Sequence, residues 1–261
     1  MSLLDADTAI QEALEVATAL PVFITGSAVA ALRHNDHYAF SDVDVFCGSQ
    51  NALVVAAQRF LSNGFELADR DKRVWQRWLE HGFNAWHTNS IKLTRGDVEV
   101  NCIYKLVDGH PTTSLSQVIE SFDFGLLASG YDARDGILRD LRPYFFPGMD
   151  VDGPLPLLPI RRSNWRNGFL SQYQGLREVG RYVKYIDYGY DLSLVREDLI
   201  QGYSMAAEYL IGRGDPEKLQ LGSIYQSLAM SIEDNEIDKL REAGAEIMWL
   251  DDLDAIMEKL E

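Results

Sequence analysis

Prolines are concentrated in one short segment of the chain. Five of the eight prolines lie between positions 143 and 159. Because proline fixes φ and has no amide hydrogen, a segment this rich in proline is unsuited to a helix interior or a central strand. We therefore predict a linker over positions 140–160, between a first domain at residues 1–145 and a second domain at residues 160–261.

The hydrophobic pattern changes at this linker. Before it, apolar segments change between helical spacing and strict alternation, which is typical of an α/β or α+β domain. After it, nearly all apolar residues have helical spacing. The chain is therefore expected to join a domain that contains a β-sheet to an all-α C-terminal domain.

The first domain is expected to begin with a helix, because Thr8 and Gln11 form a capping box ahead of an amphipathic run. A short apolar strand at residues 22–25 follows, and Gly26-Ser27 then precedes a run of good helix formers. The later predicted elements are a strand at 42–47, a helix at 52–61, a hairpin of 91–94 with 98–104, and a helix at 116–122.

Composition points to an ordinary globular protein. Of the 261 residues, 46% are hydrophobic and 25% are charged. No apolar run reaches the roughly 18 residues of a membrane helix, and the start lacks the regions of a signal peptide. Cys47 and Cys102 are too few for a disulfide framework or a zinc cluster. We expect no membrane association and a reducing, cytoplasmic location.

The net charge of −16 argues against an extended nucleic-acid surface, because phosphate contacts need Lys and Arg. The charge is uneven, however. Residues 232–261 hold 11 acidic and 3 basic side chains, whereas residues 158–186 hold six basic side chains and one acidic one. Within that basic segment, helical spacing aligns Arg177, Arg181 and Lys184 on one face. The pattern indicates a local anionic ligand, and a solvated basic face is the alternative interpretation.

The segment Asp42-Val43-Asp44 carries the strongest chemical signal. On a strand, residues two apart point to the same face, so Asp42 and Asp44 would present two carboxylates side by side. Two adjacent carboxylates repel each other unless a cation lies between them. Mg²⁺ is the expected cation, because it takes oxygen ligands from one or two carboxylates and from substrate phosphates.

Two further features fit a triphosphate and its metal ions. Gly26-Ser27 at a helix start offers free backbone N–H groups and a hydroxyl for phosphate. In the later hairpin, Asp97 and Glu99 alternate with apolar residues, so either acid can complete a two-metal site. Glu99 is favoured, because it lies inside the predicted strand and Asp97 lies at the turn.

This ordered set of residues resembles the polymerase-beta-like nucleotidyltransferase superfamily. Two other segments extend the resemblance, which covers about 180 residues. Ser121-Phe122-Asp123-Phe124 looks like the Arg-Asp-Phe-Thr segment in the heads of tRNA CCA-adding and poly(A) polymerase enzymes. The sequence from Arg181 to Tyr190 looks like their Arg-rich helix, which ends in a Gly-Phe pair.

The resemblance implies an α+β fold, in which a small mixed β-sheet nucleotidyltransferase domain with helices precedes an all-α domain. It also implies two Mg²⁺ ions and transfer of a nucleoside monophosphate from an NTP, ATP or CTP, with release of pyrophosphate. Catalytic and metal-binding roles then fall on Asp42, Asp44, and Glu99 or Asp97. Contacts to the nucleotide fall on the following residues: Gly26, Ser27, Asp123, Arg177, Arg181 and Lys184.

The sequence leaves the acceptor open. It can be an RNA 3′ end such as that of tRNA, a protein or a small molecule, and the acidic composition favours the last two. A non-catalytic module that binds NTP as a sensor is the competing hypothesis.

Overall fold

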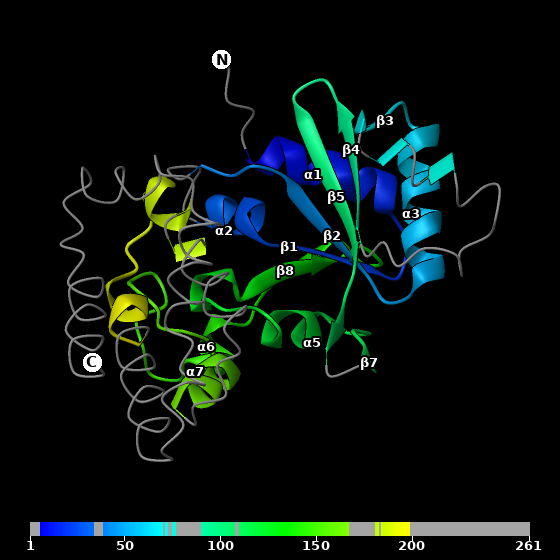
Figure 1. Ribbon diagram of the computed structural model, residues 1–261. Coiled ribbons are helices and arrows are strands. Elements are labelled where there is room, and N and C mark those ends of the chain that lie inside the picture. Colours follow the sequence, from blue (N-terminus) through cyan, green and yellow to red (C-terminus); the bar gives the residue numbers. More distant parts are fainter. Residues whose placement is uncertain are drawn as a thin grey trace, which may run out of the picture. The chain divides into compact units, whose positions relative to one another are not determined.

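The protein divides into two compact units, Met1–Asp152 and Gly153–Glu261. Figure 1 shows the computed structural model, which describes residues 6–33, 39–69, 71–72, 75–76, 90–107, 110–166, 181–182 and 184–198. None of the described helices has the length and apolar character needed to cross a bilayer.

The first unit is built on a mixed seven-stranded sheet with the strand order β3-β4-β5-β2-β1-β8-β9. Strand β2 pairs with β5 in parallel, and all other neighbours in the sheet are antiparallel. The strands are β1 (Val22–Thr25), β2 (Val43–Cys47), β3 (Glu66–Leu67), β4 (Ser90–Arg95), β5 (Val98–Tyr104), β8 (Ser129–Asp132) and β9 (Ile137–Asp140). A separate short hairpin joins β6 (Leu106–Val107) to β7 (His110–Pro111). The predicted mixed sheet of an α+β fold is confirmed.

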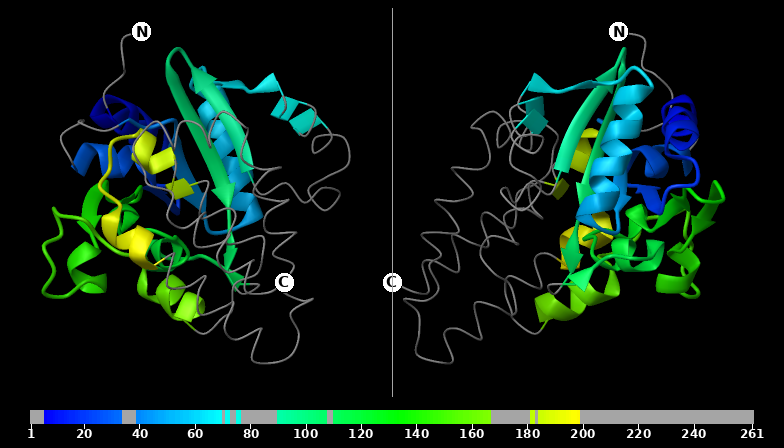
Figure 2. Two further views of the ribbon diagram at one scale, coloured as in Figure 1. Left: turned by 60° about the vertical axis from the view of Figure 1, so that its left-hand side comes forward. Right: turned by 90° about the vertical axis from the view of Figure 1, so that its right-hand side faces the viewer.

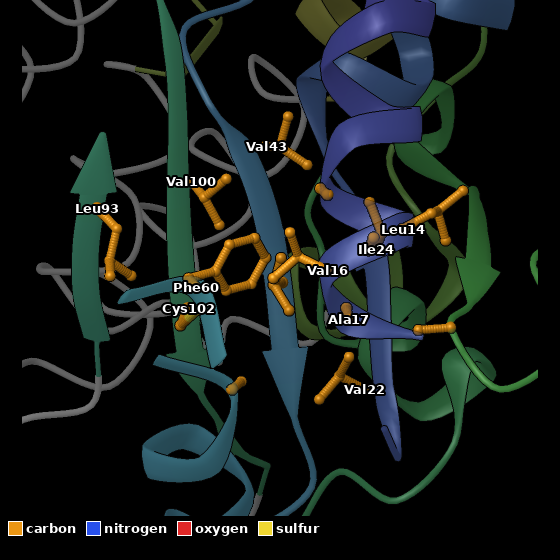
Figure 3. Close-up of a cluster of buried hydrophobic side chains, with 14 of the residues drawn as sticks. Leu14, Val16, Ala17, Val22, Ile24, Val43, Phe60, Leu93, Val100 and Cys102 are labelled. Atoms are coloured by element: carbon orange, nitrogen blue, oxygen red, sulfur yellow. The ribbon is translucent and has the colours of Figure 1, made fainter. Parts of the chain in front are cut away.

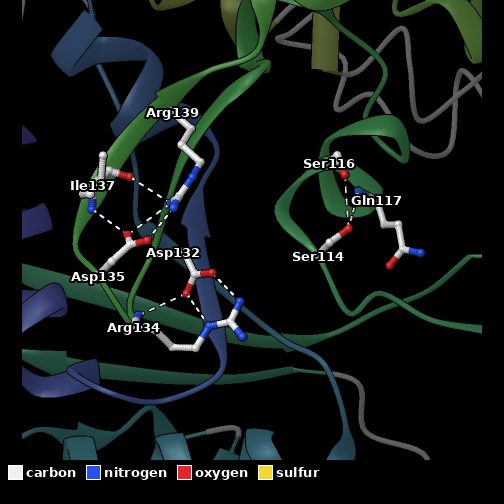
Figure 4. Close-up of polar contacts among 8 residues, drawn as sticks. All are labelled: Ser114, Ser116, Gln117, Asp132, Arg134, Asp135, Ile137 and Arg139. Atoms are coloured by element: carbon white, nitrogen blue, oxygen red, sulfur yellow. Dashed lines mark hydrogen bonds and ion pairs between the residues drawn. The ribbon is translucent and has the colours of Figure 1, made fainter.

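Helices connect these strands. In the first unit they are α1 (Ala6–Ala17), α2 (Ser27–Arg33), α3 (Gln50–Ser62), α5 (Leu115–Glu120), α6 (Arg142–Phe145) and the 3₁₀ turn η2 (Gly125–Leu127). Serine side chains cap two of them: Ser49 accepts a hydrogen bond from the Ala52 amide, and Ser114 accepts one from the Gln117 amide. Figure 4 shows the second cap. Such caps satisfy amide donors that the first turn of a helix leaves unpaired.

One face of the sheet forms the hydrophobic core with α1, α2 and α3. Alternate residues of the central strands point into it, among them Ile24, Val43, Val100 and Cys102, and Phe60 of α3 packs against them (Figure 3). Figures 1 and 2 show α3 beside the hairpin of β4 and β5. Period-two alternation therefore leaves Thr25, Asp44 and Asn101 on the opposite face.

The opposite face is partly covered by α5. Gly130 of β8 lies where a Cβ atom would meet the Leu115 side chain at 2.7 Å and the Ile24 carbonyl oxygen at 2.8 Å. The glycine thus lets α5 approach β8 closely. Near the start of β2 this face carries polar and charged side chains instead, and these form the candidate site.

The predicted strand at residues 22–25 and the predicted hairpin match β1, β4 and β5, but the sequence analysis missed three strands of the sheet, which are β3, β8 and β9. Strands β8 and β9 have no clear apolar alternation, since β8 reads Ser-Gly-Tyr-Asp. The predicted linker also contains α6, in which Pro143 lies in the first turn. Proline is tolerated there, because the amide hydrogen that it lacks would have no partner within the helix.

The second unit contains α7 (Pro159–Arg166), and helical turns at 181–182, 184–187 and 193–198 are also described. Its buried Asp198 ties two segments together: Arg162 Nε lies 2.8 Å from Asp198 Oδ1, and the Leu157 amide donates to Asp198 Oδ2 at 3.3 Å. Residues 199–261 lie outside the described residues, so an all-α C-terminal domain over residues 160–261 stays a prediction.

Candidate active site

The turn from β1 into α2 lies directly against the carboxylate of Asp44. Gly26 has a φ of +95°, a conformation that L side chains rarely adopt. A Cβ atom at Gly26 would lie 2.5 Å from Asp44 Oδ2. Sheet register explains the approach, because Thr25 of β1 pairs with Asp44 of β2. Glycine is required here both by the backbone conformation and by the space available.

Asp42 and Asp44 lie at the start of β2. The predicted strand at 42–47 is one residue too long, because β2 begins at Val43. Asp42 is the residue that precedes the strand. Ser41 Oγ donates a hydrogen bond to Asp42 Oδ1 at 2.7 Å. Val43 and Val45 are buried in the core on the other face. The alternation that the sequence predicts for this segment is therefore present in the sheet.

Strand β5 places Asn101 opposite Asp44. The two residues are partners in the parallel pairing of β2 with β5, and Asn101 Nδ2 donates to Asp44 Oδ1 at 3.3 Å. The other amide atom, Asn101 Oδ1, is buried and has no hydrogen-bond partner among the described residues. Sequence reasoning missed Asn101, because only the register between two distant strands brings it to Asp44.

Glu99 lies one step along the same face. It precedes Val100, the partner of Val43, so Glu99 and Asp42 occupy corresponding positions on the two strands. The Glu99 carboxylate accepts a hydrogen bond from Lys92 Nζ at 2.5 Å. Lys92 Nζ is also 3.8 Å from Asp42 Oδ2. Lys92, which the sequence analysis did not single out, thus connects two of the predicted metal ligands.

Asp97 is not brought to this group. It lies exposed in the turn between β4 and β5, after Gly96 with its φ of +58°. Three residues lie between Asp97 and Asn101, so the two are four positions apart, which corresponds to roughly 13 Å in an extended strand. A role for Asp97 as a ligand of the same metal ion therefore has no support in the geometry.

The remaining nucleotide contacts are less directly described. Ser27 is buried as the first residue of α2, and Asp123 is buried in the segment between α5 and η2. The Phe122 ring lies 5.5 Å from that of Phe46 on β2 and has Lys105 Nζ 5.2 Å above it. This packing anchors the segment that contains Asp123 in the first unit.

The predicted basic helix belongs to the second unit. Arg177 lies outside the described residues, whereas Arg181 and Lys184 lie in described helical turns. The helical turn at 184–187 is followed by Gly189, whose φ is +93°, and the amides of Gly189 and Tyr190 donate to the carbonyls of Ile186 and Tyr185. That is the hydrogen-bond pattern of a Schellman cap. The roles predicted for Arg177, Arg181 and Lys184 toward the nucleotide remain predictions.

Neither cysteine takes part in this arrangement. Burial raises the pKa of Cys47 to about 12, and burial together with the neighbouring Cys47 raises that of Cys102 well above its usual value. A thiol that stays protonated is a poor nucleophile and a poor metal ligand. Both residues act as small buried side chains of the core.

The residues present fit a divalent cation. Within the described ranges, no three His, Cys, Asp or Glu side chains form a metal cluster on their own. Asp42 and Asp44 nevertheless supply carboxylate oxygens, and Asn101 adds the buried Oδ1 that lacks a partner. Carboxylate and amide oxygens are the ligands that Mg²⁺ prefers. The cation, if bound, would lie beside the glycine turn.

Comparison with protein families finds no match, and comparison with curated proteins finds none either. Solved structures give matches at low identity. One is a tRNA nucleotidyltransferase complexed with a primer tRNA and an incoming ATP analog, with 16% identity over 89% of this chain and 60% of that one, and a TM-score of 0.48. Another is a CCA-adding enzyme with CTP, with 13% identity over 94% of this chain and 56% of that one, and a TM-score of 0.47.

A third match, a tRNA-processing enzyme in an apo form, has 16% identity over 91% of this chain and 57% of that one, with a TM-score of 0.48. The chain spans less than two thirds of the length of these structures. It is thus similar to tRNA nucleotidyltransferases and CCA-adding enzymes, at a level where functional assignment rests on the chain's own residues.

Proposed function

We propose that this protein is a Mg²⁺-dependent nucleotidyltransferase, which transfers a nucleoside monophosphate from an NTP to an acceptor hydroxyl and releases pyrophosphate. The observation that carries the proposal is the close packing of the Gly26 turn against Asp44. It joins a helix start able to bind phosphate to a carboxylate able to bind metal. Two acidic residues that were only solvated at the surface would not require a glycine this close to one of them.

Mg²⁺ would be held by Asp42 and Asp44, with Asn101 Oδ1 beside them. When bound, it would neutralise charge on the phosphates and assist departure of pyrophosphate. Asn101 Nδ2 orients the Asp44 carboxylate by its hydrogen bond at 3.3 Å. Gly26 keeps the approach to Asp44 free of side-chain atoms, and the backbone amides at the start of α2 bind phosphate oxygens.

The second unit supplies positive charge in this proposal. Arg177, Arg181 and Lys184 would contact the triphosphate or the acceptor, because a loose phosphoryl transition state needs cationic donors around it. Asp123 would contact the nucleotide, as the resemblance implies. ATP or CTP is the proposed donor.

The acceptor is proposed to be a protein or a small molecule rather than a long RNA. The net charge of −16 opposes binding to an extended polyphosphate backbone. An RNA 3′ end such as that of tRNA remains an outcome that the experiment distinguishes.

The test is label transfer with the full chain, Mg²⁺ and a cell extract, using each of the four NTPs labelled either at the α- or at the γ-phosphate. Nucleotidyl transfer retains the α label on the acceptor and loses the γ label as pyrophosphate. The Asp42→Ala/Asp44→Ala double variant should transfer no label. Asp135→Ala is the matched control, because Asp135 lies at the exposed β8–β9 turn, paired with Arg139 (Figure 4).

Treatment of the labelled product with nuclease or protease identifies the class of acceptor. Loss of the label on nuclease treatment identifies RNA, and loss on protease treatment identifies a protein. A labelled product that resists both identifies a small molecule. NTP binding without pyrophosphate release from any NTP would reject the enzyme and support the non-catalytic NTP-binding module.

A further inference from the structure

We propose that Lys92 supplies one of the cations that the carboxylates require, so that Glu99 acts through Lys92 and not as a metal ligand. This inference rests on the proposed metal-dependent function and specifies which groups supply positive charge to the carboxylates of its site. It replaces a site of three acids and two metal ions with one divalent cation and a fixed ammonium group.

The contacts of Lys92 support this role. Its Nζ lies 2.5 Å from Glu99 Oε1 and 3.8 Å from Asp42 Oδ2. The three side chains are only 26%, 30% and 14% exposed, respectively. Partial burial reduces screening by water, so this interaction is stronger than an exposed surface pair.

The backbone of Lys92 is fixed on both sides. Its amide donates to Asp71 Oδ2 at 3.1 Å, and its carbonyl accepts from the Ala68 amide at 3.0 Å. Ile91 and Leu93 on either side of it are buried in the core on the other face. Strand alternation therefore directs the Lys92 side chain to the face that carries Asp44 and Asn101.

Charge balance explains what the ammonium does. Lys92 places one positive charge between the carboxylates of Asp42 and Glu99. Without Lys92, Asp42 and Glu99 would form a second pair of carboxylates that attracts another divalent cation.

The test counts Mn²⁺ ions bound to the full chain without NTP, by the loss of the free Mn²⁺ signal in electron paramagnetic resonance. Lys92→Met should bind one more Mn²⁺ than the native chain. Lys92→Arg, which keeps the charge, should bind the native number. Lys72→Met is the matched control, since Lys72 Nζ pairs with Asp69 Oδ1 at 2.7 Å on the surface.

The Lys92→Met/Glu99→Gln double variant should return to the native number, because it removes the carboxylate that the additional ion uses. Equal Mn²⁺ binding by the native chain and Lys92→Met would overturn the proposal, as would an additional ion that persists after Glu99→Gln. Thermal unfolding verifies each fold, and Lys92→Gln replaces Lys92→Met if the latter does not fold.

Failure of this inference and failure of the proposed function give different results. If the expected Mn²⁺ counts are found but no pyrophosphate is released, the role of Lys92 is supported and the enzymatic function is rejected. If pyrophosphate is released but the native and Lys92→Met forms bind equal numbers of Mn²⁺ ions, only the role of Lys92 is rejected.

Discussion

Gly26 and Asp44 are in such close contact that a single Cβ atom on Gly26 would lie 2.5 Å from Asp44 Oδ2. Gly26 directly follows β1 and Asp44 lies in β2, and the register of β1 with β2 brings them together. This contact defines the candidate active site more sharply than the spacing of the acids, because it constrains both the backbone and the carboxylate.

Gly26→Ala should impair both the fold and the site. The positive φ costs about 1–3 kcal/mol for a residue with a side chain, and the new methyl group displaces the Asp44 carboxylate. Gly136→Ala is a matched control, because Gly136 has a φ of +65° but open space around its Cβ position. Urea unfolding should show destabilisation in both variants, and Mn²⁺ binding should weaken only in Gly26→Ala. Equal Mn²⁺ binding in both would show that Gly26 has no role in the site.

Asp44→Asn should abolish label transfer while leaving the fold intact, because the amide keeps the size of the side chain but removes its charge. A loss of several kcal/mol in transition-state stabilisation corresponds to a rate decrease of at least about 100-fold. Asp42→Asn should act in the same direction. Label-transfer rates are measured for each variant, and near-ultraviolet circular dichroism verifies that its fold is intact. Near-native turnover in either variant would contradict the assignment.

Asp140→Asn should strongly destabilise the first unit. Arg142, only 1% exposed, donates to Asp140 through Nε at 2.9 Å and Nη2 at 2.8 Å, and Arg33 Nη2 donates at 2.9 Å. A buried guanidinium without its partner costs about 3 kcal/mol or more. The control is Asp135→Asn, which alters the exposed pair with Arg139 and should leave the urea midpoint unchanged. Equal midpoints for both variants would contradict this prediction.

The same carboxylate should contribute to acid sensitivity. Burial raises the pKa of Asp140, but hydrogen bonds and charge from Arg142, with Arg33, outweigh burial and hold it below its usual value. A depressed folded-state pKa stabilises the protein at neutral pH, and this contribution is lost as pH falls from about 4 through the lower folded value. Unfolding free energies between pH 5 and 2 should therefore decrease less in Asp140→Asn than in the native chain.

At alkaline pH, Cys47 should make the free energy of unfolding decrease as pH rises. Burial raises its pKa to about 12 from a usual value near 9. Between these values the unfolded chain releases the thiol proton while the folded chain retains it, so stability should fall as pH rises. Cys47→Ala removes this contribution, and the difference between the two chains should grow smaller from pH 9 to 11. Slow labelling of the native thiols by a disulfide reagent at pH 8 provides an independent check.

Local features of the sequence predicted much of the first unit. The apolar run of β1, the Gly26-Ser27 turn and the alternation around Asp42 and Asp44 depend on residues close together in the chain. Hydrophobic period and turn chemistry act over such short distances, which is why these elements match the structure. Strands β8 and β9 were missed because their composition gives no period. Pairing with β1 fixes β8, and pairing with β8 fixes β9.

The sequence by itself determined that two carboxylates at the start of one strand follow a glycine turn, since alternation and backbone conformation are local. Only the tertiary structure decided what faces them. Asn101 lies opposite Asp44 across a separation of 57 residues, and Lys92 reaches Glu99 and Asp42 through the pairing of β4 with β5 and of β5 with β2. Strand order and register are set by core packing and hydrogen bonding over the whole sheet, which no short segment encodes.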